Sequence, residues 1–169
     1  MKSRFFNSYN LTRRIAILRR IHLSLALLLI IGGPLRADER LWVLLAPSQA
    51  KAVSRLCSRG PVAKIDGGWQ PTTKDIDAME EALSKSTYLR SKLTSKPDRA
   101  SDPRQYYRQY VGVIVAGRKL IYVNGMCEKP PSYWTKTLVD VCDGGRCFWG
   151  ALYDPVNGEF SQYEMNGVA

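Results

Sequence analysis

The sequence predicts an α+β domain, with one or two N-terminal helices packed on a four- to five-stranded antiparallel meander sheet. Three observations lead to this fold class. The clearest helical pattern lies before the polar segment 94–104, almost every strand-like segment lies after it, and the strand-like segments are joined by short turns. Helices and strands that are segregated in this way are typical of α+β folds rather than of alternating βαβ units, and we expect the helices on one face of the sheet.

The N-terminal half of the domain contains the helical signals. Residues 41–45 form a short apolar run, either a strand or the lead-in to a helix, and residues 47–56 suggest a short helix. A longer helix is expected to begin at Thr72 or the next residue, because Thr72 and Asp75 have the spacing of a capping box. Its apolar face consists of Ile76, Met79 and Leu83, with Leu89 and Leu93 further along.

The C-terminal half contains the strand signals. Aromatic and β-branched residues recur in short runs, and the first two runs, joined by residues 116–119, indicate a hairpin. Residues 154–158 have the composition of a tight turn that closes with a left-handed glycine. The expected strands are 106–115, 120–124, 138–142, 147–153 and 160–165.

Residues 1–37 have the layout of a secretory signal peptide. A basic segment without acids is followed by an apolar stretch over residues 21–31 and then by Gly32-Gly33-Pro34. The apolar stretch is about half of the ~20 residues that span a bilayer core. We therefore expect cleavage near Ala37 and a mature chain, residues 38–169, that forms one periplasmic or extracellular domain without a transmembrane segment.

The net charge changes once the signal peptide is removed. The full chain has 25 basic and 15 acidic residues, a net charge of +10, which would favour nucleic acid or a membrane surface as a partner. Seven of the basic residues and none of the acidic ones lie in residues 1–37, so the mature chain carries only +3. We therefore expect no nucleic-acid partner.

The mature chain contains no histidine, because His22 is the only one in the sequence. A chain without imidazole cannot form a Ser-His-Asp triad, a Cys-His dyad or a histidine metal site. We expect no catalytic residues, no metal and no cofactor.

All four cysteines, Cys57, Cys127, Cys142 and Cys147, lie in the mature chain. An even number in an exported chain indicates two disulfides, and the isolated C-x4-C spacing does not match a zinc site. We slightly favour Cys142–Cys147 with Cys57–Cys127, because the first pair flanks a four-residue turn. Cys127–Cys142 with Cys57–Cys147 is almost as good.

Tyrosine and arginine alternate along the first long strand and define a candidate binding face. The other face of that strand, with Val111 and Val113, is the better candidate for the core, so the face with tyrosine and arginine is expected to be exposed. Tyrosine and arginine are enriched at protein-binding hot spots, although cross-strand aromatic pairs can also simply hold a sheet together. The candidate binding residues are Tyr106, Arg108, Tyr110, Tyr122 and Trp134.

The function expected from these features is that of a secreted or periplasmic, non-catalytic binding module whose partner is another protein. It would bind through the exposed sheet face or the hairpin tips, and an inhibitor or an immunity-type protein would fit. The alternatives are a histidine-free hydrolase that uses two carboxylates, and a purely structural envelope protein.

Overall fold

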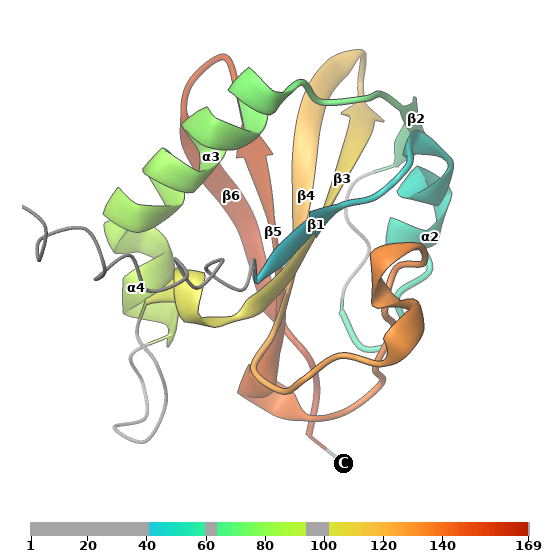
Figure 1. Ribbon diagram of the computed structural model, residues 1–169, viewed down its shortest axis with the longest axis vertical. Helices are drawn as coiled ribbons and strands as arrows, with labels where there is room; N and C mark the ends of the chain where they lie inside the picture. Colours follow the sequence, from blue (N-terminus) through green and yellow to red (C-terminus); the bar gives the residue numbers. More distant parts are fainter. Residues whose placement is uncertain (1–40, 60–63, 94–101, 169) are drawn as a thin grey trace, which may run out of the picture. The chain divides into compact units, whose positions relative to one another are not determined.

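The computed structural model describes residues 41–59, 64–93 and 102–168 (Figure 1). The expected signal peptide lies outside the described residues, as does most of the expected polar loop, residues 94–101. The described part is a mixed α+β domain with three α-helices and one six-stranded, mostly antiparallel sheet. No helix in these three segments is both long and apolar enough to cross a membrane.

The sheet has the strand order β1-β3-β4-β5-β6, and β2 also pairs with β3. Every pair is antiparallel except β1 with β3, which is parallel. Four of the five strands expected by range are present, and β1, in the run at residues 41–45, and β2, which had no clear sequence signal, bring the total to six. The strands are β1 (Trp42–Leu44), β2 (Ile65–Gly68), β3 (Tyr107–Val115), β4 (Arg118–Met126), β5 (Phe148–Asp154) and β6 (Glu159–Met165).

The expected hairpin is confirmed as β3 and β4, which pair from Tyr107 opposite Met126 to Val115 opposite Arg118. Its turn is shorter than expected, since only Ala116 and Gly117 connect the strands. Both have positive φ, 49° and 75°, as a two-residue hairpin turn that follows the twist of the strands requires.

The expected capping box is also confirmed, at the start of α3 (Thr73–Lys85). The Thr72 hydroxyl accepts from the Asp75 N–H at 3.3 Å, and the Asp75 carboxylate accepts from the Thr72 N–H at 2.7 Å. Ser86 ends the helix, and its hydroxyl accepts from the Leu89 N–H in α4 (Thr87–Leu93) at 3.2 Å. The apolar pattern that spans both helices is therefore interrupted by one turn.

Both faces of the sheet are covered, rather than the single face expected. On one face Ile76, Met79 and Leu83 of α3 pack with Leu89 and Leu93 of α4 against the sheet (Figure 1). On the other face a second core forms around the short helix α2 (Ala50–Val53), which follows a 3-10 turn, Pro47–Gln49. The expected helix at 47–56 is therefore present in a shorter form.

Residues 138–142 do not form the expected strand. β4 pairs directly with β5, so no position in the sheet is left between them. Leu138 and Val139 are nevertheless buried, in the second core and beside it, which accounts for their apolar character. Their backbone N–H groups donate to side chains instead of to a strand: to Gln49 at 3.1 Å and to Gln109 at 2.8 Å.

Candidate functional site

The expected exposure of the tyrosine and arginine face of β3 is wrong. Tyr106, Arg108 and Tyr110 are 2%, 3% and 0% exposed. Tyr106 and Tyr110 belong to the core that α3 and α4 form with the sheet. Two helices, rather than solvent, lie over this face, so these side chains offer no surface to a partner.

Arg108 instead connects β3 to α3. Its guanidinium donates to the Tyr110 hydroxyl at 2.7 Å and to the Tyr106 carbonyl at 2.7 Å, and it lies 3.2 Å from a Glu80 carboxylate oxygen. The Tyr110 hydroxyl also donates to Glu80. Burial, supported by the nearby Glu80 charge, raises the pKa of Tyr110 well above its usual value. The group is a buried, hydrogen-bonded ion pair that holds two elements together.

The other two candidate binding residues lie elsewhere. Tyr122 is 2% exposed, packs in the second core, and accepts a 2.7 Å hydrogen bond from the buried Arg59. Trp134 is half-buried in a 3-10 turn, with its ring edge-to-face against Tyr107 at 5.9 Å between centroids. The five residues therefore do not form one surface.

The four cysteines form two disulfides, as expected, but with the third possible pairing. Cys57 is bonded to Cys142 and Cys127 to Cys147, so both of the pairings considered from the sequence are wrong. The turn between Cys142 and Cys147 does not close a hairpin, because it ends in a 3-10 turn that leads directly into β5. Cys127 and Cys147 approach Glu128 closely, but their sulfurs are bonded to each other and offer no thiolate to a metal.

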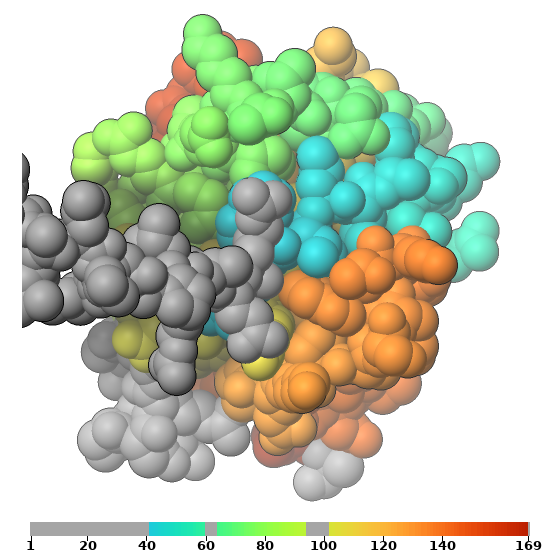
Figure 2. Space-filling view, viewed as in Figure 1, coloured from blue at the N-terminus to red at the C-terminus, as the bar shows by residue number. Residues whose placement is uncertain are grey.

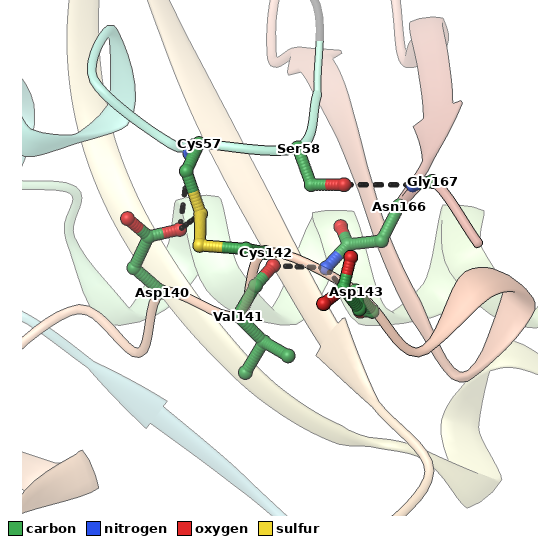
Figure 3. The surroundings of a disulfide bond; sticks show 8 residues. All are labelled: Cys57, Ser58, Asp140, Val141, Cys142, Asp143, Asn166 and Gly167. Carbon is green, nitrogen blue, oxygen red and sulfur yellow. Dashed lines mark hydrogen bonds between the residues drawn. A yellow bond between two sulfur atoms is a disulfide. The ribbon is translucent and has the colours of Figure 1, made fainter. Parts of the chain in front are cut away.

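The exposed disulfide, Cys57–Cys142, lies where three segments of the chain meet (Figure 3). Asp140 accepts from the Cys57 N–H at 3.2 Å, and the Ser58 hydroxyl accepts from the Gly167 N–H at 2.7 Å. The Asn166 side-chain amide donates to two carbonyls beside Cys142. The disulfide thus ties the segment after α2 to residues 140–143, and the hydrogen bonds of Asn166 and Gly167 add residues 166–167 to the same junction.

A hollow of about 1090 Å³ lies at one end of the sheet. Ile121 pairs with Tyr153, so the β3–β4 and β5–β6 turns lie at the same end, next to the start of α3 (Figure 1). In the space-filling view both turns emerge behind α3 along its upper edge (Figure 2). We call this feature the hairpin-tip hollow; the lining residues that matter below are Trp69, Asp75, Arg118, Lys119, Asp154 and Val156.

Trp69 is held rigidly in the hairpin-tip hollow. Its indole N–H donates to the Leu120 carbonyl at 2.8 Å, and its backbone N–H donates to Gly112 at 3.2 Å. A Cβ atom on Gly112 would lie 2.1 Å from the Trp69 carbonyl oxygen, so only glycine allows this close approach. The Lys119 ammonium lies 5.4 Å from the centroid of the indole ring, within cation–π range.

Two carboxylates line the hairpin-tip hollow, and both are stabilised in the ionised form. The Thr72 hydroxyl and then the Thr72 N–H lower the pKa of Asp75. Burial alone would raise the pKa of Asp154, but hydrogen bonds from the Val156 N–H and from Arg118 outweigh it and leave the pKa below its usual value. A general acid needs a raised pKa, so neither side chain is suited to that role near neutral pH.

Comparison of the chain with protein-family models, with curated proteins and with solved structures found no match. The hairpin tips were expected from the sequence as a possible contact region, but none of the residues that line the hairpin-tip hollow was among the candidate site residues. The signal available in the sequence was a tryptophan three residues before a helix cap, which indicates a site only once the two turns are placed beside it.

Proposed function

We propose that the protein is an exported, non-catalytic binding module that recognises another protein through the hairpin-tip hollow. Export is supported by the signal-like pattern of residues 1–37 and by the two disulfides, which are typical of oxidising compartments. The observation that carries the binding role is the hairpin-tip hollow itself, which is lined by an aromatic ring and by two cationic side chains. An inhibitor or an immunity-type protein would belong to this class.

The rival function, a hydrolase with two carboxylates, is less well supported. Such an enzyme needs one protonated carboxyl group as the acid and one ionised group as the base or nucleophile. In the hairpin-tip hollow the pKa values of Asp75 and Asp154 both lie below their usual values. A carboxyl group whose pKa is lowered is poorly suited to be the protonated acid near neutral pH, so this pair does not divide the two roles.

The binding role can be tested by capture on the immobilised, disulfide-bonded protein. Extracts of the envelope and of the secreted fraction of the producing cells are passed over wild type, over a double variant with Arg118→Glu and Lys119→Glu, and over Lys129→Glu. Lys129 is exposed and follows the far end of β4, so it provides a single charge reversal away from the hairpin-tip hollow.

We expect wild type and Lys129→Glu to retain the same polypeptide in stoichiometric amount, and the double variant to lose it. Retention of no polypeptide by wild type, or equal retention by all three proteins, would contradict the proposal. The intact mass of the exported protein, before and after reduction, tests export separately. It should show cleavage near Ala37 and the addition of four hydrogens when the two disulfides open.

A further inference from the structure

Three of the four carboxylate oxygens in the hairpin-tip hollow already accept hydrogen bonds from the protein itself. One oxygen of Asp75 accepts from both the Thr72 N–H and the Thr72 hydroxyl, each at 2.7 Å. The oxygens of Asp154 accept from the Val156 N–H at 2.9 Å, from the Asn157 amide at 2.9 Å and from Arg118. These carboxylates are parts of a helix cap and a turn, and only Asp75 Oδ1 accepts no hydrogen bond within the described residues.

Its donors, in contrast, are largely unused. Arg118 contacts Asp154 through Nη2 alone, and its side chain is 63% exposed. Lys119 lies over the Trp69 ring, and within the segments 41–59, 64–93 and 102–168 its ammonium group has no hydrogen-bond acceptor. The spare hydrogen-bonding capacity of the charged side chains in the hairpin-tip hollow is therefore mainly cationic.

Apolar surface lies beside these donors. The indole of Trp69 is half-buried, and Val156, at the tip of the β5–β6 turn, is 88% exposed. A side chain this exposed gains free energy when a partner covers it. A ligand that fills the hollow would thus meet a ring and an aliphatic side chain next to two cations.

From this arrangement we propose that the group recognised by the hairpin-tip hollow is an acidic segment of the partner protein, in which a carboxylate lies next to an aromatic or large apolar side chain. The carboxylate accepts from the free Nε and Nη1 of Arg118 and from the Lys119 ammonium, and the apolar side chain lies over Trp69 and Val156. The proposal rests on the proposed function and specifies its partner. The competing arrangement is a cationic group of the partner that takes the place of the Lys119 ammonium over the Trp69 ring.

Three tripeptides that differ only in the central side chain separate these possibilities: acetyl-Phe-Glu-Phe-amide, acetyl-Phe-Gln-Phe-amide and acetyl-Phe-Lys-Phe-amide. Each is titrated into the uniformly 15N-labelled, disulfide-bonded protein, and the backbone and indole N–H shifts are followed by NMR up to millimolar peptide. Arg118→Gln with Lys119→Gln removes the cations, and Lys129→Gln is the matched control.

We expect the Glu peptide to shift the Trp69 indole and the Lys119 and Val156 amides, and to bind about fivefold more tightly than the Gln peptide, since exposed ion pairs are weak. The preference should disappear in the double variant and persist in Lys129→Gln. Equal binding of the Glu and Gln peptides, a preference for the Lys peptide, or no shift at these residues would overturn the inference. If the capture experiment still yields a partner that depends on Arg118 and Lys119, only the assigned chemistry fails, and the proposed function stands.

Discussion

Replacement of Gln109 by leucine should be among the most destabilising single changes on the second face of the sheet. Gln109 is 0% exposed and lies on β3 beneath residues 132–142. Its carbonyl accepts from the Val139 N–H at 2.8 Å and from the Asn124 amide at 3.0 Å. Its amide donates to the carbonyls of Thr137, at 2.8 Å, and Trp134. The Gln109 side chain thus provides hydrogen bonds to the backbone of residues 134–139, which has no neighbouring strand to pair with.

The decrease in the free energy of unfolding follows from the hydrogen bond that each partner of Gln109 loses. Val139 and Asn124 are 4% and 0% exposed, so one N–H on each is left without an acceptor and without water, at about 1–3 kcal/mol each. Thr137 is exposed and Trp134 is half-buried, so water can replace the lost donor at their carbonyls. The free energy of unfolding should therefore fall by roughly 2–6 kcal/mol, a large part of the ~5–15 kcal/mol typical of a domain. For a domain of this size the melting temperature should fall by roughly 6–25 °C.

Urea denaturation of the disulfide-intact protein measures this change, with Gln105→Leu as the control. Gln105 is exposed, and only its backbone N–H forms a hydrogen bond in the described residues, so its replacement should change the free energy of unfolding by less than about 0.5 kcal/mol. The reasoning would be refuted if Gln109→Leu cost less than about 1 kcal/mol, or no more than the control.

Three further predictions concern other parts of the domain. Gly112→Ala should lower the free energy of unfolding by more than about 2 kcal/mol in urea denaturation, because the added Cβ would lie 2.1 Å from the Trp69 carbonyl oxygen. Gly67→Ala, whose Cβ would have its nearest neighbour at 3.8 Å, should be nearly neutral, and equal effects of the two substitutions would contradict this. Peptide mapping should find Cys57 joined to Cys142, and limited reduction should open this exposed disulfide first; any other pairing would be decisive against the structure. Because the pKa of Asp75 is lowered in the folded state, its ionised carboxylate should stabilise the fold above about pH 4, and this stabilisation should be lost as the pH falls through the folded-state pKa. The difference in free energy of unfolding between wild type and Asp75→Asn should therefore shrink between about pH 5 and pH 2. A constant difference would show that the charge of Asp75 does not contribute.

Local signals in the sequence were reliable where the chemistry is local. The capping box at Thr72 needs only residues three positions apart, and the turn that ends in Gly158, with φ 72°, needs only five neighbours. The β3–β4 hairpin is likewise joined by two residues. Each of these features was predicted because its hydrogen bonds close within a few residues.

The prediction that the candidate binding residues form an exposed face was wrong because their burial depends on elements far away in the sequence. Alternation along β3 correctly separated its two faces, but it could not show that helices α3 and α4 would cover one face and α2 the other. Gln109 and Asn124 look like surface residues by type, yet they are fully buried because they bond to each other and to residues 137–139. Burial of a polar side chain depends on partners far away in the chain.

The sequence by itself determined the α+β class, the start of α3, the central hairpin and the presence of an even set of cysteines, because composition, caps and turns act over short distances. Only the tertiary structure decided which cysteines pair and that residues 138–142 cross the second face as a loop. It alone brought Trp69, Arg118 and Asp154 together at one end of the sheet. These features depend on which strand lies beside which, and strand order is set by the packing of the whole chain.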